Sequence, residues 1–237
     1  ITWNSAQSRY DFSGRPSGAA SDWEDRPVNY VSWYSAARFC NWKTSGNTES
    51  GAYLFDANGD FTGIDRQQAL NNHEQVFVIP SENEWYKAAY YNPADQTYFD
   101  YPTGSDTLPL SEAPAGGSNS ANYYDSSEGF ALDSPYYRNT VGAYSNSPSP
   151  YNTYDQGGNV WEWNEELESG EQIMRGDSFF YPDVFLKSDT RNSRSPEDMP
   201  NLADVGFRVA VIPEPASILL LLPVVLAFWI RKRVRVQ

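Results

Sequence analysis

The stretch Gly157-Gly158-Asn159-Val160-Trp161-Glu162-Trp163-Asn164 decides how the rest of the chain is organised. Its two glycines allow a tight turn or a close approach of the backbone to another group. Polar and apolar residues then alternate, so a strand here places Trp161 and Trp163 on one face, which must be buried. Glu162 lies between them, and a carboxylate at the edge of a core needs a cation or several hydrogen-bond donors.

Two interpretations of this stretch stay open. The first is a site for a hard cation such as Ca²⁺, which takes oxygen ligands. Its ligands would be two carboxylates and two backbone carbonyls, those of Asp155, Glu162, Gly158 and Val160. The second is a glycine turn, a core strand and a surface glutamate, with no metal.

The composition indicates a folded, acidic protein. Aromatic residues make up 16% of the 237 residues, which favours a packed fold over disorder. The formal net charge is −14, and so acidic a chain will not bind nucleic acid by neutralising its phosphates. The single cysteine, Cys40, rules out an intrachain disulfide, and its position on an apolar helix face predicts a small buried side chain.

Local signals predict two helices and several strands. One helix follows Ser32 and stops near Gly46, and apolar residues recur along it at helical spacing. The other begins at the capping box Ser81-Glu82-Asn83-Glu84 and ends before Pro93. Strands are predicted at 76–79, 173–179 and 205–211, with a brief one at 141–144.

Two stretches are predicted to be mainly irregular. Residues 46–75 read as an insertion, in which 56–60 form a turn and not an EF-hand loop, because Asp65 stands where that loop needs a glutamate. The only histidine, His73, lies in a polar part of it and cannot build a multi-histidine metal site. Residues 94–155 form a second long loop region, and loops of that length are usually functional or held by a metal. Asn122 and Asp133 are candidate oxygen ligands within it.

The C-terminal segment has a different character. After Pro213-Glu214-Pro215, residues 216–230 are uncharged and mostly apolar, and Arg231-Lys232-Arg233 follows. As a helix this run would be about 22 Å long, shorter than the roughly 30 Å hydrocarbon core of a bilayer. The alternatives are a buried C-terminal helix and a membrane insertion with the basic end inside, and we expect the insertion.

Several blocks along the chain resemble, in order and spacing, the formylglycine-generating enzyme (sulfatase-modifying factor) domain. The blocks are Pro27-Val28-Asn29-Tyr30-Val31-Ser32-Trp33 with Ala36-Ala37-Arg38-Phe39, Ile79-Pro80-Ser81-Glu82-Asn83-Glu84-Trp85, Gly158-Asn159-Val160-Trp161-Glu162-Trp163, Arg175-Gly176-Asp177-Ser178 and Gly206-Phe207-Arg208-Val209-Ala210. The resemblance covers about residues 23–211 and implies an α+β, C-type-lectin-like fold with two main helices, small antiparallel sheets and extensive loops. Residues 1–22, which start without Met, are then the remnant of a truncated N-terminal part of the domain.

The resemblance implies two calcium sites that would hold the loop-rich region. One aligns with the side chains of Asp155 and Glu162 and the carbonyls of Gly158 and Val160. The other aligns with the side chains of Asn122 and Asp133 and the carbonyls of Tyr123 and Pro135.

The resemblance does not extend to the family's redox chemistry. Its formylglycine-generating members use a cysteine pair, which by position falls near Tyr181 and Leu186 here. Neither residue provides a thiolate to bind copper. Relatives that make sulfoxides use a histidine-bound iron, and His73 is alone. We therefore expect no copper or iron, and assign no catalytic residue.

Two functions from different classes follow. The first is a non-catalytic, calcium-stabilised module whose Tyr-, Asn-, Ser- and Gly-rich loops at 89–101 and 117–154 bind a glycan or an envelope protein. The alternative is an oxidase or other modifying enzyme that acts on exported proteins or small molecules. Its candidate groups, which also suit ion pairs and turn caps, are Arg191, Arg194, Arg208, Asp177, Asp183 and Asp189.

Residues 212–237 resemble a PEP-CTERM sorting signal. Such a signal implies export in a Gram-negative bacterium and anchoring through residues 216–230 as a transmembrane helix. It also implies cleavage by an exosortase-type enzyme near Pro-Glu-Pro, which would leave the protein in the cell envelope or extracellular matrix.

Overall fold

The computed structural model describes residues 2–4, 9–11, 22–134, 136–198 and 203–213. Its chain forms two compact units, a larger one from 1–32 and 81–207 and a smaller one from 33–80 and the residues after Phe207. None of the helices within the described ranges has the length and apolar character needed to cross a membrane. The PEP-CTERM segment and its apolar run at 216–230 lie outside those ranges.

The smaller unit contains helix α1 (Trp33–Ser45), which buries Trp33, Ala36, Ala37, Cys40 and Asn41. These residues share one side of the helix, so the predicted spacing and the burial of Cys40 are confirmed. The ring of Trp33 meets Tyr53 edge-on at 5.6 Å. The unit also contains two antiparallel strand pairs, which are β3 (Tyr53–Phe55) with β4 (Phe61–Ile64), and β5 (Gln75–Val78) with β16 (Ala210–Pro213).

A second helix of this unit, α2 (Arg66–Asn72), lies in the stretch 46–75 that was predicted to be irregular. Strands β3 and β4 lie there too, so that prediction was wrong. Asp65 caps the helix by accepting a hydrogen bond from the Gln68 backbone N–H at 2.8 Å. The turn predicted at 56–60 is confirmed, since one carboxylate oxygen of Asp56 accepts from the backbone N–H of Asn58 and Asp60.

The larger unit is built around a four-stranded sheet in the order β14-β13-β12-β15. The glycine-rich motif leads into its longest strand, β12 (Trp161–Glu168), which pairs antiparallel with β13 (Glu171–Arg175) and parallel with β15 (Val205–Phe207). Helix α3 (Glu82–Tyr90) packs against β12, and its predicted capping box is present. Trp161 and Trp163 are fully buried, as predicted.

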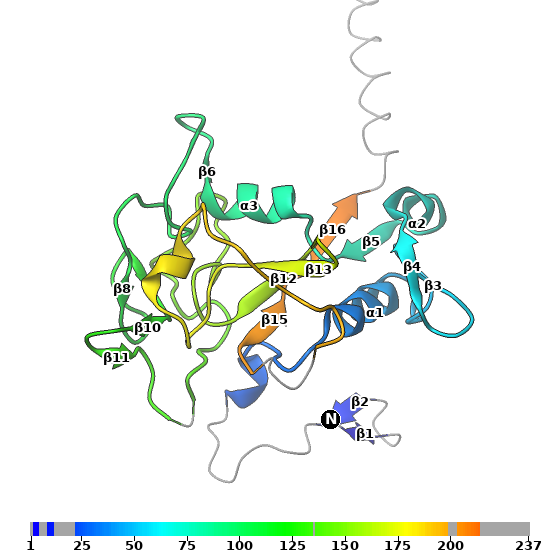
Figure 1. Cartoon of the computed structure of the whole chain (residues 1–237), viewed down its shortest axis with the longest axis horizontal. Helices are drawn as coiled ribbons and strands as arrows, with labels where there is room; N and C mark the ends of the chain where they lie inside the picture. Colours follow the sequence, from blue (N-terminus) through cyan, green and yellow to red (C-terminus); the bar gives the residue numbers. More distant parts are fainter. Residues whose placement is uncertain (1, 5–8, 12–21, 135, 199–202, 214–237) are drawn as a thin grey trace, which may run out of the picture. The chain divides into compact units, whose positions relative to one another are not determined.

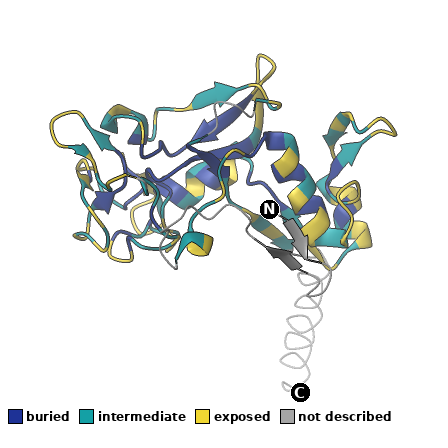
Figure 2. Cartoon of the chain, turned by 90° about the horizontal axis from the view of Figure 1, so that it is seen from below, coloured by how far each residue is buried: buried dark blue, intermediate teal, exposed yellow. Residues whose placement is uncertain are grey.

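The opposite face of β12 is buried as well, because Glu162 is only 6% exposed and Asn164 is fully buried. The interpretation of Glu162 as a surface residue was therefore wrong. The helices differ from this part of β12. Figure 2 shows that they carry both buried and exposed residues.

The long stretch 94–155 is loop-rich, as predicted, and Figure 1 shows it in green with only brief strands. The strand predicted at 141–144 is a turn, with Gly142 at φ 78°. The short elements of the larger unit are β1 (Thr2–Asn4), β2 (Arg9–Asp11), the 3-10 helices Trp23–Asp25 and Asp183–Leu186, β6 (Tyr91–Asn92), β7 (Thr97–Tyr98), β8 (Leu110–Ser111), β9 (Ser120–Ala121), β10 (Tyr124–Asp125), β11 (Gly129–Phe130) and β14 (Asn192–Arg194).

Two strand boundaries differ from the predictions. β13 ends at Arg175 and not at residue 179, because Gly176 has φ 96° and turns the chain away. The strand predicted at 205–211 is two strands, β15 and β16, which pair with β12 and β5 in different units. The described residues thus form a mixed α+β fold with three α-helices and small sheets.

Candidate functional site

The turn before β12 is held by close backbone contacts. A Cβ on Gly158, whose φ is 73°, would lie 2.1 Å from the Asn122 carbonyl oxygen. The same oxygen accepts from the Asn159 N–H at 2.7 Å, and the Gly158 N–H donates to the Gly176 carbonyl at 2.6 Å. Glycine is therefore required at position 158, and the predicted turn is confirmed.

The predicted ligands of the first calcium site lie within and next to this turn along the chain. Asp155 accepts from the Asn139 side chain at 3.2 Å and from the Gly142 N–H at 2.5 Å. Glu162 accepts from the indole N–H of Trp85 at 2.7 Å. No group of three or more His, Cys, Asp or Glu side chains in the described ranges could hold a metal ion. That finding does not test a site with two carboxylates and two carbonyls, so calcium at Asp155, Gly158, Val160 and Glu162 stays a prediction.

The predicted ligands of the second site lie along the neighbouring segment. Asn122 is buried, and its side-chain amide donates to the Tyr137 carbonyl at 2.8 Å and to the Asn139 side chain at 2.9 Å. The Tyr123 carbonyl accepts from the Ser111 hydroxyl at 2.7 Å. Asp133 is exposed, and Pro135 lies outside the described residues. This site also stays a prediction.

The positions that align with the family's cysteine pair are occupied by packed side chains. Leu186 is fully buried in a cluster with Tyr101, Ala121 and Tyr123. The Tyr181 ring meets the edge of Trp161 at 6.0 Å. The only cysteine, Cys40, is buried in α1 of the other unit, so neither position has a thiol.

A buried acidic group lies next to these positions. The Ser178 hydroxyl donates to Asp204 at 2.7 Å, and the Ser178 N–H donates to Asp177 at 2.7 Å. The second carboxylate oxygen of Asp177 is buried without a hydrogen-bond partner in the described structure. Burial raises the pKa of Asp177 well above its ordinary value, and it raises the pKa of Asp204 too. Sequence reasoning noted Asp177 but missed Asp204.

Two of the other groups considered for an enzyme act on this acid pair in addition to burial. The Asp183 charge further raises the pKa of Asp177, and the Arg194 charge lowers that of Asp204. Arg191 forms an exposed ion pair with Glu168 at 3.1 Å, which is the non-catalytic role considered for it in the sequence. Arg194 donates to the Tyr181 hydroxyl at 3.4 Å, and Arg208 belongs to the smaller unit. Asp183 starts a 3-10 helix, and Asp189 accepts from the neighbouring Thr190 hydroxyl at 3.3 Å.

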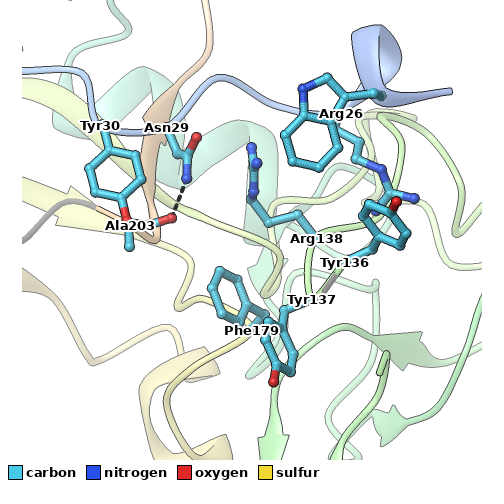
Figure 3. Close-up of a pocket in the computed structure, with 9 residues that line it drawn as sticks. Arg26, Asn29, Tyr30, Tyr136, Tyr137, Arg138, Phe179 and Ala203 are labelled. Carbon is cyan, nitrogen blue, oxygen red and sulfur yellow. Dashed lines mark hydrogen bonds between the residues drawn. The ribbon is translucent and has the colours of Figure 1, made fainter. Parts of the chain in front are cut away.

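A cavity of about 200 Å³ opens in the larger unit, and of its residues only 136–138 belong to a predicted binding loop, the one at 117–154. It is lined by Trp23, Arg26, Asn29, Tyr30, Tyr136, Tyr137, Arg138, Phe179 and Ala203. Figure 3 shows Arg138 in the middle, with Asn29 and Tyr30 to one side and Arg26 and Tyr136 to the other. The signal that could have found part of it was the Tyr- and Asn-rich composition of 117–154, which supplies residues 136–138.

Aromatic rings and guanidiniums alternate around this cavity. The Arg26 guanidinium lies 5.1 Å from the centroid of the Tyr136 ring, and that of Arg138 lies 5.5 Å from the Trp23 ring. Tyr137 and Phe179 stack in parallel with their centroids 5.7 Å apart. Burial and the nearby Arg26 charge both lower the pKa of Arg138.

The model of the sulfatase-modifying factor enzyme 1-like domain (FGE-sulfatase) matches residues 3–212. The chain belongs to this family. The match runs from β1 to β16 and therefore includes both units, the glycine turn and the aromatic cavity.

Two solved structures are similar to this chain at the level of fold, and a third is similar at a lower score. CarF is similar with a TM-score of 0.55 and 24% identity over 80% of this chain and 68% of that one. Treponema denticola variable protein 1 is similar with a TM-score of 0.50 and 21% identity over 81% and 72%. PvdO from Pseudomonas aeruginosa reaches a TM-score of 0.48 at 18% identity over 87% and 65%. No curated protein matches.

Proposed function

We propose that this FGE-sulfatase domain is a non-catalytic, calcium-stabilised module with a C-type-lectin-like fold, which binds a glycan or an envelope protein. The packing of Tyr181 and Leu186 carries the proposal. Leu186 is fully buried among apolar and aromatic side chains, and Tyr181 packs edge-on against Trp161. A site that activates oxygen through copper needs thiolates, and neither side chain can supply one.

The distribution of regular structure supports a binding role. A four-stranded sheet and α3 form a scaffold, and a loop region of about 60 residues extends from it. Loops on a rigid scaffold are where binding residues concentrate, because they vary without disturbing the core. The cavity between Arg26, Arg138 and their aromatic neighbours lies partly on this loop region.

The calcium part of the proposal is supported by buried oxygen groups around the glycine turn. Glu162 and Asn122 are almost wholly buried, and Asn122 pairs with Gly158 through a parallel bridge. A bound cation would offset the cost of burying the carboxylate. It would also order a region with little regular structure.

The proposed location is the cell envelope of a Gram-negative bacterium, after membrane anchoring and exosortase-type cleavage. It rests on residues 212–237 alone, with Pro-Glu-Pro, an apolar run and a basic end. The mass of the mature protein should correspond to a chain that ends before Ala216. An intact Gln237 in the envelope fraction would contradict the cleavage.

Oxygen consumption with a cysteine-containing peptide tests the absence of catalysis. Protein loaded with Cu(I) should consume no more oxygen than the peptide and copper alone, whereas a thiol-containing family member serves as the positive control. Metal analysis of the purified protein should find calcium and no stoichiometric copper or iron. Copper-dependent oxygen uptake would overturn the proposal in favour of a modifying enzyme.

A further inference from the structure

We infer that the cavity lined by Arg26, Arg138 and their aromatic neighbours binds the carboxylate of a uronic acid, the acidic residue of a saccharide (Figure 3). The inference rests on the proposed binding function and names its site and ligand class.

Arg26 presents donors that need an acceptor. Its side chain is 10% exposed, and its one ionic contact in the described structure joins Nη2 to Asp22 at 3.3 Å. Its Nε and Nη1 atoms are buried without a hydrogen-bond partner among the described residues. Burying such donors unpaired is costly, and an anion bound in the cavity would offset part of that cost through its attraction to the guanidinium charge.

Arg138 adds a second positive charge to the same cavity. It donates to the Pro27 carbonyl and is held over the Trp23 ring. Burial lowers the pKa of Arg138, and the nearby charge of Arg26 lowers it further. Asp22 pairs with Arg26, and a ligand with a single negative group would offset the charge of Arg138.

The other walls of the cavity suit a sugar ring. The stacked pair of Tyr137 and Phe179 and the half-exposed ring of Tyr30 offer flat apolar faces, while the two tyrosines also carry hydroxyls. A saccharide likewise combines apolar ring faces with hydroxyls. The volume of about 200 Å³ is below that of sites for drug-sized ligands, so it fits one ring.

Two further features bear on the function of this cavity and on the class of ligand that it binds. Tyr30 has φ 53°, a conformation that bulky side chains rarely adopt and that clusters at binding sites. The net charge of −14 repels densely charged polyanions, and Glu24 and Asp25 line an adjoining cavity that Arg26 also borders. A uronic acid, with one carboxylate per ring, meets both the local positive charge and the acidic surroundings.

Calorimetric titration of the purified protein with galacturonic acid tests the inference. Galactose has no carboxylate, galactose 6-sulfate carries a different anion, and N-acetyltyrosine is a carboxylate without a sugar. Galacturonic acid should bind saturably, and galactose should bind about tenfold more weakly or worse, because a hydrogen bond to a charged group contributes about 1.5–3 kcal/mol.

The variants Arg26→Met and Arg138→Met should each weaken galacturonic acid binding by about tenfold or more. Arg38→Met is the matched control, because Arg38 also lies over an aromatic ring, that of Phe55 at 3.9 Å, but does not line the cavity. It should bind like the parent protein. Tyr30→Ala changes a side chain that is 54% exposed, so it tests the ring contact in a folded protein, and binding should fall severalfold. Melting curves check that each variant is folded.

Equal binding of galactose and galacturonic acid, tighter binding of galactose 6-sulfate or N-acetyltyrosine, or an unchanged affinity in folded Arg26→Met and Arg138→Met would overturn the inference. So would the absence of saturable binding in the millimolar range. Neutral glycans bound equally by all the variants would overturn it while leaving the proposed binding function intact. The proposed function fails separately, through copper-dependent oxygen uptake.

Discussion

Replacing Glu162 separates two roles that its position allows. This residue of β12 is 6% exposed, and its carboxylate accepts a hydrogen bond from the Trp85 indole N–H at 2.7 Å. Glu162→Ala removes this acceptor and leaves a buried donor without it. The cost in the free energy of unfolding is about 1–3 kcal/mol, whether or not calcium is present.

Calcium coordination would add a second, separable contribution. At a calcium concentration about 100 times the Kd, binding to the native state alone adds about 2.7 kcal/mol to stability. Urea denaturation of the parent protein in calcium and in a chelator should therefore differ by an amount of this order. Glu162→Ala should lose the difference and also be less stable in the chelator.

Glu162→Gln is the matched control, because its amide oxygen can still accept from Trp85 but carries no charge. It should resemble the parent protein in the chelator and lose most of the stabilisation by calcium. If the parent is equally stable in both buffers, or if Glu162→Gln keeps the full calcium effect, Glu162 is not a calcium ligand. The hydrogen bond to Trp85 would then remain as an observed role of this carboxylate.

Three further sets of substitutions should change the free energy of unfolding, as measured by denaturation. An ion pair joins Glu82 of α3 to Arg175 of β13, and their side chains are 14% and 7% exposed. Glu82→Gln should lower the free energy of unfolding by about 3 kcal/mol, and the double change with Arg175→Met should lower it by clearly less than the sum of the two single changes. Additive losses would contradict the coupling. Burial raises the pKa of Asp177, so the native state binds its proton more tightly and stability should fall as pH rises from the unfolded-state pKa to the native one. Each pKa unit is worth about 1.4 kcal/mol, and Asp177→Asn should flatten this dependence; an unchanged pH profile would refute it. Gly158→Ala should cost about 4 kcal/mol or more because its Cβ meets the Asn122 carbonyl, whereas Gly142→Ala, with open space around it, should cost about 1–2 kcal/mol; equal losses would refute the contact.

The features that sequence reasoning found are those encoded locally. The capping box at Ser81 and the apolar spacing around Cys40 act within a few residues, so each can be recognised without knowledge of the fold. Helix α2 was missed because it is short and polar, with Ala69 as its single buried residue, and therefore shows no apolar period. The break in 205–211 was missed because each half pairs with a distant strand, which local alternation does not encode.

The aromatic cavity could not be predicted because its walls come from four separate segments. Residues between 23 and 30 meet 136–138, Phe179 and Ala203, with no fixed spacing among them. The Ser178–Asp204 contact likewise joins residues 26 positions apart. Both depend on the loops that return to the sheet, whose paths follow from tertiary packing and not from a short motif.

The pairing of β5 with β16 has a consequence for the order in which the chain folds. Gln75–Val78 is synthesised early, but its strand partner Ala210–Pro213 follows only after the whole of the segment 81–207. Until then one edge of β5 has no ladder partner, and an open edge can pair with another chain. The smaller unit therefore completes its sheet last during translation, and a ribosome stalled before residue 208 would expose an aggregation-prone edge although most of the domain is already made.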